Sequence, residues 1–323
     1  MDLFRHDEEL SKRLALIESE IDMFMRNNIG EPKILYETAM HLLGAGGKRI
    51  RSLLCMIACE AVGGSIERIL PYAVAVELVQ TASLLHDDII DDDALRRGVS
   101  SAHKKYGSRM AVIAGDLLVA QAVKLIARDS DPNSLKSLAT LGVAMCEGEA
   151  NDYLLATQPL GSYGVEEYLN MVEKKTGSFM KGAVKVGAII GGGNEDQIKV
   201  LEEYAKNIGI AFQMRDDTLD IISSKEEMGK PVLADVVQKR SNYVVILALE
   251  AATKKQREQC LTDLEHGNIE AILDLIDSTN AVQIAIKKTG AFIDAAKQSL
   301  EHGELLNSHL LQKLADFMSI RMH

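Results

Sequence analysis

The sequence has little of what would indicate a β-sheet protein, a membrane protein or a nucleic-acid-binding protein. It contains no tryptophan, and only 4% of its 323 residues are aromatic. Alternating polar and apolar strands bounded by turn dipeptides are missing, which argues against a sheet. Basic residues number 36 against 47 acidic ones, and a net charge of −11 disfavours the wrapping of nucleic acid. No apolar run reaches the ~18 residues of a membrane span, and the charged start is unlike a signal peptide.

From these absences we expect a cytoplasmic protein with no nucleic-acid partner and no integral membrane segment.

Cysteine is also scarce, with four residues in the chain. Cys55 and Cys59 lie one helical turn apart in the apolar stretch RSLLCMIACEAV, and no further ligands follow at the spacing of a zinc finger. We therefore expect these cysteines to be reduced thiols in the core, where cysteine behaves as a small hydrophobic residue.

The sequence does have apolar residues that recur at three- and four-residue spacing, which is the period of a helix. The five prolines are expected where such periodic segments begin or end. Segments 71–86 and 108–127 are apolar nearly all round, which predicts helices at the centre of a bundle, whereas 1–27 and 281–319 are amphipathic and predict outer helices. We expect an all-α fold, a helical bundle with a central cavity, in a single domain over residues 1–323.

Two clusters of aspartate follow apolar segments and share the spacing D-D-x-x-D. They occur in LLHDDIIDDDALRRG and in FQMRDDTLD, as Asp87, Asp88 and Asp91, and as Asp216, Asp217 and Asp220. Residues four apart on a helix project from one face, so the like charges of Asp87 and Asp91 require a cation. Carboxylates that face each other across a bundle would form an all-oxygen site, which suits Mg²⁺ better than Zn²⁺. Magnesium binds phosphate oxygens, so a diphosphate substrate is expected.

Basic residues next to glycine support this hypothesis. They occur in GGKRIR (46–51), RRG (96–98) and KKTG (174–177), and further lysines and an arginine follow the second cluster at Lys230, Lys239 and Arg240. Positive charge beside glycine at the start of a helix is suited to phosphate binding.

Three other motif interpretations fail on the sequence itself. A P-loop would need Ser or Thr after Lys48, where Arg49 stands, and a preceding strand. The dipeptide His86-Asp87 lacks the further histidines of a metal-dependent phosphohydrolase. A serine hydrolase would need a G-x-S-x-G elbow, which the sequence does not contain.

The motifs taken together resemble those of the trans-prenyltransferases, the isoprenyl diphosphate synthases of the geranylgeranyl and polyprenyl type. Between Gly46 and Ser241 the family order is followed by GGKRIR, Q-x6-DDIID-x4-RRG, AGDLL, KTG, FQMRDDTLD and MGK. The resemblance implies the isoprenoid-synthase fold and a homodimer. It also implies a magnesium-dependent, head-to-tail condensation of isopentenyl diphosphate onto an allylic diphosphate, which gives an all-trans polyprenyl diphosphate.

The same resemblance implies a role for each matching residue. Three magnesium ions are expected per active site, two held by Asp87 and Asp91 and one by Asp216, with supporting carboxylates from Asp88, Asp217 and Asp220. The allylic diphosphate would be bound by Arg96, Lys175 and Lys230. The diphosphate of isopentenyl diphosphate would be bound by Lys48, Arg51, Gln80 and Arg97. At the reacting centre the resemblance places Lys175, with Thr176 and Gln213 beside the carbocation.

The sequence departs from the family pattern at two places. Gly148-Glu149 stands where many relatives have Gly-Gln. After Lys230, the stretch PVLADVVQKRSNY lacks the usual glycine before Asp235 and the usual Gly-Lys-x-Thr, so that either Lys239 or Arg240 would supply the basic group.

Product length is expected to depend on the residues upstream of Asp87. Four, five and eight positions before it stand Ser83, Ala82 and Val79. The first two of these are small, and Ala75 and Val76 continue the small lining. In short-chain relatives an aromatic residue at one of the first two positions closes the pocket. Because one helical turn rises about 5.4 Å, close to one isoprene unit, we expect a product of C25 or longer, with C20 as the alternative. Small residues would equally serve close packing between helices.

Two further alternatives share parts of this pattern. A class I terpene cyclase would carry an N-S/T-E type second motif in place of DDTLD. A non-catalytic subunit of a heteromeric synthase would bind substrate without condensing it, but such subunits tend to lose one aspartate cluster, and this chain has both.

Overall fold

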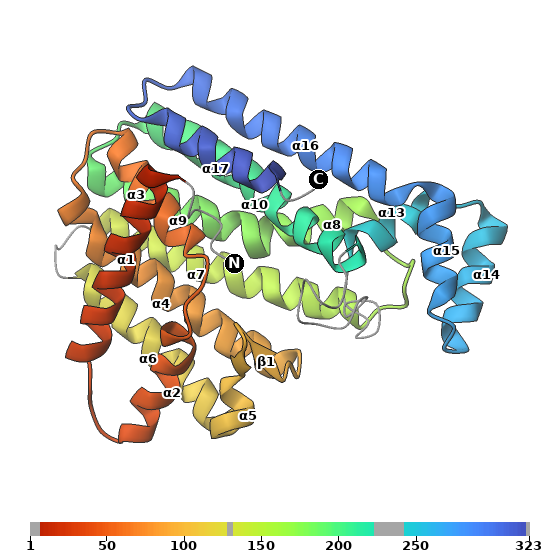
Figure 1. Ribbon diagram of the computed structural model, residues 1–323, viewed down its shortest axis with the longest axis horizontal. Coiled ribbons are helices and arrows are strands. Elements are labelled where there is room, and N and C mark those ends of the chain that lie inside the picture. Colours follow the sequence, from red (N-terminus) through yellow and green to blue (C-terminus); the bar gives the residue numbers. More distant parts are fainter. Residues whose placement is uncertain (1–6, 128–131, 223–241, 321–323) are drawn as a thin grey trace. The chain divides into compact units, whose positions relative to one another are not determined.

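The computed structural model describes residues 7–127, 132–222 and 242–320, and it is helical nearly throughout (Figure 1). Its elements in chain order are α1 (Glu8–Asn27), α2 (Lys33–Gly44), α3 (Ile50–Ala61), α4 (Ile66–Ile90), β1 (Leu95–Arg96), β2 (Val99–Ser100), α5 (Ala102–Tyr106), α6 (Ser108–Ile126), α7 (Pro132–Ala156), α8 (Val165–Val172), the π-helix η2 (Glu173–Gly177), α9 (Ser178–Gly191), α10 (Glu195–Ile222), α13 (Tyr243–Ala251), α14 (Lys254–Glu265), α15 (Glu270–Thr279), α16 (Ala281–Ser299), the 3₁₀ helix η3 (Leu300–His302) and α17 (Ser308–Ile320). The predicted all-α fold is confirmed; within the described ranges the one sheet is the short β1–β2 hairpin.

The chain divides into two compact units. Unit 1 comprises Met1–Thr140, Gly182–Glu202 and Gly303–Leu311, and unit 2 comprises Leu141–Lys181, Glu203–His302 and Gln312–His323. Four of the divisions fall inside helices α7, α9, α10 and α17, and the fifth follows the end of η3 at His302. The expectation of a single domain over residues 1–323 stays a prediction.

Helix α4 forms the core of unit 1, where it packs mainly against α6 and α3 (Figure 1). The helix is apolar because nearly every face is covered, and its residues from Tyr72 to Ala82 are buried. By length and composition α4 could cross a membrane, but 72% of its apolar window is buried inside the protein, as in a core helix. The predicted central position of the 71–86 helix is thus confirmed.

The predicted start of this helix was wrong. Helix α4 begins at Ile66, with the Ser65 side chain accepting a hydrogen bond from the backbone N–H of Arg68, so Pro71 lies inside the helix. Proline lacks the backbone N–H of a normal helical residue and usually marks an end. Here the polar cap at Ser65 starts the helix before the proline, and the apolar residues after Pro71 continue it.

The predicted central position of 108–127 was also wrong for this chain. One face of α6 packs against α4, whereas Val112, Ile113, Val119 and Val123 are 40–50% exposed. These valines and the isoleucine recur at the spacing that places them along one side of a helix. Apolar periodicity reports that a face avoids water, and it does not distinguish burial inside one chain from burial between chains.

The thiol prediction holds for the core cysteines. Cys55 and Cys59 are free and buried in α3, and Cys260 is free and buried in α14. Helix α9 approaches α3 so closely that a side chain at Gly187 would overlap the carbonyl oxygen of Cys55. Burial raises the pKa of Cys59 to about 11, so this thiol stays protonated and unreactive at neutral pH.

Unit 2 has its own core, in which α13 is buried on every side and packs against α8, α15 and α16. Asn242 caps α13 by accepting hydrogen bonds from the backbone N–H groups of Val244 and Val245. The rings of Tyr168 and Tyr243 lie with their centroids 5.3 Å apart and join α8 to α13. Both tyrosines contact Asp217 of the second acidic motif.

Candidate active site

The first acidic motif lies at the C-terminal end of α4, in unit 1. The backbone N–H of Asp91 donates to the carbonyl oxygen of Asp87 at 2.8 Å, so helical spacing persists to the last residue of the motif. The Asp87 and Asp91 side chains therefore lie on one face, one turn apart, and both are partly exposed. Asp88 between them is fully buried. This arrangement fits the assignment of Asp87 and Asp91 as ligands and of Asp88 as a supporting residue.

Arg96 binds the buried part of this motif. Its Nε lies 2.6 Å from Oδ1 of Asp88, and its Nη2 lies 2.9 Å from Oδ2 of Asp93. Burial raises the pKa of Asp88, and the adjacent Arg96 opposes that shift. In this structure Arg96 thus joins the β1–β2 hairpin to the acidic helix end. Its expected contact with an allylic diphosphate stays a prediction.

The hairpin turns at Arg97 and Gly98, whose φ angles are +53° and +76°. Positive φ at both central residues is the conformation of a type I′ turn, which glycine adopts without strain and arginine does not. Arg97 Nη1 donates to the carbonyl oxygen of Leu42 at 2.9 Å, and Nη2 lies 3.3 Å from Oε1 of Glu77. The side-chain contacts of Arg97 thus hold a backbone conformation that its residue type disfavours.

The GGKRIR segment opens α3, as predicted, because the helix begins at Ile50. Gly46 and Gly47 have positive φ angles, and Arg49 is left-handed at the N-cap with its side chain buried. Lys48 is exposed, and Arg51 is partly buried in the first turn of α3. A basic residue in a tight turn before a helix N-terminus is the setting expected for an anion.

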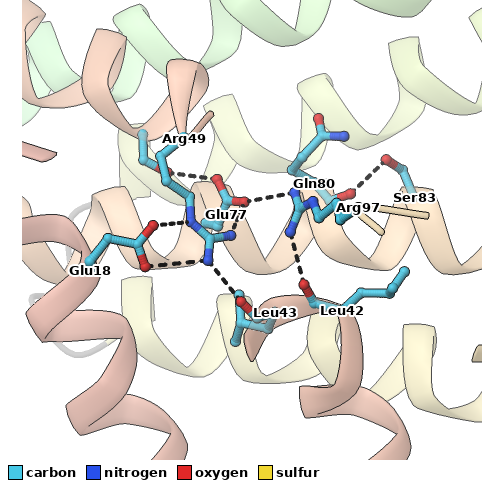
Figure 2. A network of polar contacts seen from close by, with 9 residues as sticks. Glu18, Leu42, Leu43, Arg49, Glu77, Gln80, Ser83 and Arg97 are labelled. Carbon is cyan, nitrogen blue, oxygen red and sulfur yellow. Dashed lines mark hydrogen bonds and ion pairs between the residues drawn. The ribbon is translucent and has the colours of Figure 1, made fainter. Parts of the chain in front are cut away.

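The pattern-based interpretation missed the polar network that surrounds Arg97. Figure 2 shows Glu77 between Arg49 and Arg97, with Gln80 on the same helix as Glu77. Gln80 is buried, and its Oε1 has no hydrogen-bond partner among the described residues. The sequence does contain a signal, since Glu77 is the one charged residue in the long apolar run YAVAVELVQTASLL. A charge in such a run must be paired when it is buried.

The residues expected to govern product length are packed tightly. Ala75 and Val76 are inaccessible, Ala82 is 2% exposed and Val79 is 8% exposed, whereas Ser83 is partly exposed. Helix α6 approaches the end of this segment, and a side chain at Gly115 would overlap the His86 ring. Burial of this degree is what close helix packing produces.

The second acidic motif lies in the last turns of α10, in unit 2, and Asp217 is its best-anchored residue. Its carboxylate accepts hydrogen bonds from Tyr168 Oη at 2.6 Å, from Gln213 Nε2 at 2.9 Å and from the backbone N–H of Tyr243 at 2.8 Å. Burial and the neighbouring Asp217 raise the pKa of Tyr168 well above its ordinary value, so its hydroxyl stays a donor. Asp217 thus connects α8, α10 and α13, whereas Asp216 is partly exposed and Asp220 is buried.

Two residues expected beside the reacting centre meet in unit 2. The Thr176 hydroxyl donates to Oε1 of Gln213 over a long 3.4 Å, and the Gln213 amide donates in turn to Asp217. One amide therefore connects the π-helix η2 to the acidic motif of α10. A hydrogen-bonded amide of this kind keeps its carbonyl dipole in a fixed orientation.

The expectation that KKTG opens a helix was wrong. Lys174, Lys175 and Thr176 lie in the π-helix η2, which continues directly from α8 into α9. Lys175 Nζ lies 2.6 Å from Oδ2 of Asp152 and 2.7 Å from Oε2 of Glu149, both on α7. Lys175 is therefore positioned by carboxylates and by a π-turn, a local widening that is frequent at functional sites.

Gly148 allows this approach of α7 to η2. A side chain at this position would overlap the backbone of Lys175, so only glycine permits the contact. Glu149, the residue that departs from the family pattern, follows directly and pairs with Lys175. The departure noted in the sequence thus affects the environment of a predicted substrate-binding lysine.

Some predicted residues cannot be placed. Lys230, Lys239 and Arg240 lie outside the described residues. The two acidic motifs belong to different units, and each is described within its own unit.

The donor groups are suited to magnesium. In the described ranges no three His, Cys, Asp or Glu side chains come together as a metal cluster. Magnesium does not require one, because it keeps several waters and binds through one or two carboxylates together with substrate phosphates. The Asp87–Asp91 pair and Asp216, all partly exposed, offer oxygen ligands of this kind.

Comparison with known proteins agrees with these motifs. The family model for polyprenyl synthetase matches residues 32–278. The short chain isoprenyl diphosphate synthase of Methanothermobacter thermautotrophicus is 35% identical over 312 residues, covering 94% of this chain and 95% of that protein. The geranylfarnesyl diphosphate synthase of Aeropyrum pernix is 31% identical, covering 90% and 95%. The crystal structure of the geranylgeranyl pyrophosphate synthetase of Pyrococcus horikoshii matches with a TM-score of 0.87 at 34% identity, covering 96% and 97%. The chain therefore belongs to the polyprenyl synthetase family, the trans-isoprenyl diphosphate synthases.

Proposed function

We propose that this protein condenses isopentenyl diphosphate head-to-tail onto an allylic diphosphate to give an all-trans polyprenyl diphosphate. The observation that carries the proposal is the end of α4, where Asp87 and Asp91 share one partly exposed face. Lys48 and Arg97 lie on loops of the same unit. Carboxylates that bind magnesium and cations that bind diphosphate are the two requirements of this reaction.

The residues divide the work between two diphosphates. Lys175 and Arg96, with Lys230, would hold the allylic diphosphate, whose departure leaves about three negative charges to be stabilised. Asp87, Asp91 and Asp216 would hold three magnesium ions, which supply positive charge to the leaving diphosphate when they are bound. Thr176 and Gln213, which are hydrogen-bonded to each other, would direct oxygen dipoles toward the allylic cation. An apolar surrounding excludes water and so prevents hydrolysis of that cation.

The isopentenyl diphosphate would bind in unit 1. Lys48, Arg51, Gln80 and Arg97 are the residues we assign to its diphosphate group. Gln80 can take part because its side-chain NH₂ group is a hydrogen-bond donor, which is what the oxygens of a diphosphate accept from. It lies on α4, three residues after Glu77.

Two product lengths have support. Small residues at Ala82 and Ser83 leave the first turn upstream of Asp87 without an aromatic block, and this favours C25 or longer. The complete burial of Ala75 and Val76, two turns further along, favours C20. Because one turn corresponds to about one isoprene unit, the two candidates differ in whether the chain passes Val79.

We also propose that the protein is a homodimer that packs through α6. The support is the row of exposed apolar residues Val112, Ile113, Val119 and Val123, each 40–50% exposed on a helix whose buried face packs against α4. An apolar row of this kind is stabilised when a second copy covers it, and oligomers with two-fold symmetry use one patch twice.

We place the enzyme in the cytoplasm, in agreement with the free thiols of Cys55, Cys59, Cys146 and Cys260.

The activity assay tests the main proposal. The purified protein, incubated with Mg²⁺, isopentenyl diphosphate and allylic primers of C5 to C20, is expected to elongate a primer, and a chelator is expected to abolish turnover. Mass spectrometry of the product distinguishes C20 from C25 or longer.

Asp91→Asn should lower turnover on the order of 100-fold. Its matched control is Asp92→Asn, the same change one residue away at an exposed side chain, which should keep activity near wild type. Absence of elongation with every primer would instead support a non-catalytic subunit.

Substitution at Ala82 tests the path of the growing chain. Ala82→Phe is expected to shorten the product by at least one isoprene unit, because the ring would fill the first turn upstream of Asp87. Ala75→Leu should shorten a C25 product and leave a C20 product unchanged. Product length is again read by mass spectrometry, with thermal unfolding as the control for overpacking, which costs about 1–3 kcal/mol. An unchanged product in Ala82→Phe would contradict a chain path along α4.

Glu149 is expected to compete with substrate for Lys175. In Glu149→Gln the lysine loses the carboxylate of Glu149, so the KM for the allylic diphosphate should fall about two- to five-fold. Glu147→Gln is the matched control, since it makes the same change on the same helix beside the adjacent Lys174. A rise in KM in Glu149→Gln would mean that Glu149 orients Lys175 for binding.

The α6 surface gives a prediction for assembly. Val119→Asp combined with Val123→Asp should convert the dimer to a monomer, because two carboxylates would be buried without partners. Light scattering after size-exclusion chromatography measures the mass. The control is Ile29→Asp, which adds one carboxylate at a side chain that is 77% exposed and so leaves it in water. A wild-type protein of monomer mass would contradict the dimer.

A further inference from the structure

Glu77 is a buried carboxylate in the middle of α4, and all its recorded partners lie outside that helix. Its Oε1 lies 2.6 Å from Arg49 Nη1 and 3.3 Å from Arg97 Nη2 (Figure 2). Its Oε2 accepts a hydrogen bond from Ser52 Oγ at 3.1 Å. The side chain is 2% exposed. A carboxylate at such a site stays charged only when cations and donors surround it.

The two arginines are held from the opposite side by the end of α2. Arg49 Nη2 donates to the carbonyl oxygen of Leu43 at 2.7 Å, and Arg97 Nη1 donates to that of Leu42 at 2.9 Å. Figure 2 shows these two carbonyl groups on one helix end, each with its own guanidinium. Backbone carbonyls in the last turn of a helix carry partial negative charge and favour cations. Each guanidinium is thus held between a helix end and Glu77.

Electrostatics makes Glu77 necessary for this arrangement. Burial opposes the charge of Arg49, but Glu77 and Glu18 outweigh it and raise the pKa of Arg49. The pKa of Arg97 is lowered, chiefly by burial and with a contribution from Arg49, and Glu77 is the carboxylate that opposes this shift. Two buried guanidinium groups that share one neighbourhood repel each other, and Glu77 is the anion that both contact.

The contacts of Arg97 extend to the glycine loop. A side chain at Gly47 would come within 2.8 Å of Arg97 Cζ and 2.9 Å of its Nη2, so the guanidinium lies directly against this glycine. Lys48 is the next residue, and Gln80 follows Glu77 by three positions on α4. Residues three apart lie on neighbouring parts of one helix face. Glu77 therefore connects Arg97, the loop that carries Lys48, and the helix face that carries Gln80.

We infer that Glu77 is a positioning residue for the isopentenyl diphosphate site, where it fixes Arg97 and the glycine loop before the substrate arrives. The inference rests on the proposed function, which assigns Lys48, Arg51, Gln80 and Arg97 to that diphosphate. Glu77 itself would not touch the substrate, because its carboxylate is already bound by Arg49, Arg97 and Ser52. Groups held in place before binding do not lose conformational freedom when the ligand binds.

The test is the KM of each substrate in Glu77→Gln. We expect the KM for isopentenyl diphosphate to rise about ten-fold or more, since bonds between charged groups are lost, while the KM for the allylic diphosphate stays within about two-fold. A merely structural role would reduce the folded, active fraction and so lower the maximal rate, leaving both KM values unchanged. Equal KM values in the variant and wild type would overturn the inference.

Glu18→Gln is the matched control. Glu18 also pairs with Arg49, with its Oε1 2.8 Å from Arg49 Nε, but it is 39% exposed on α1. The same chemical change there should lower the melting temperature slightly and leave the KM for isopentenyl diphosphate within about two-fold of wild type. A similar rise in KM in both variants would mean that general loosening of Arg49 causes the effect, and would overturn the specific role of Glu77.

A double-mutant cycle with Arg97→Ala separates positioning from an independent effect. If Glu77 acts through Arg97, the double variant should have a KM for isopentenyl diphosphate within about three-fold of that of Arg97→Ala alone. If the increases in this KM in the two single variants multiply in the double variant, the inference is overturned.

Glu77→Asp is the alternative should Glu77→Gln not fold. It keeps the charge but withdraws it by one methylene, so the KM for isopentenyl diphosphate should rise about five-fold. An unchanged KM would overturn the inference. A wild-type protein without turnover would instead refute the proposed function.

Discussion

Helix α4 carries carboxylates into an apolar interior, and the structure of unit 1 depends on how they are compensated. Glu77 is paired by Arg49 and Arg97, and Asp88 by Arg96. Removing an ion from water costs several kcal/mol unless partners replace the lost hydration. Because these partners come from the glycine loop and the hairpin, the pairing also fixes both loops around the helix. Asp87 and Asp91 stay partly exposed at the helix end that the pairs hold.

Unit 2 meets the same constraint with neutral donors. Asp217 is buried and accepts hydrogen bonds from a phenol, an amide and a backbone N–H. Several hydrogen bonds to one carboxylate stabilise its charged form. The donors belong to α8, α10 and α13, so one side chain defines where three helices meet. The neighbouring Asp216 keeps its partial exposure on the same turn of α10.

The sequence allowed the fold class and the local setting of the motifs to be predicted, because both depend on short-range periodicity. Asp87 and Asp91 share a helix face and GGKRIR opens a helix, as expected. The partners of Glu77 lie 20 and 28 residues away, and no local pattern records such a separation. The exposed face of α6 was misassigned because periodicity does not tell which molecule covers an apolar row. The π-turn at Lys175 was missed because its hydrogen bonding depends on α7 lying against it, through Gly148.

The π-turn between α8 and α9 contains one residue more than an α-helix would use for the same rise, as the hydrogen bond from Ser178 N–H to the Glu173 carbonyl across five residues records. An α-helix closes each turn one residue earlier, so loss of one residue from this stretch would let it close as an ordinary α-turn with α8 and α9 still in phase. The contact between Tyr168 and Asp217 would then persist, whereas the local widening that contains Lys175 and Thr176 would be lost. A deletion in η2 would consequently act on these two residues and not on the packing of the helices on either side.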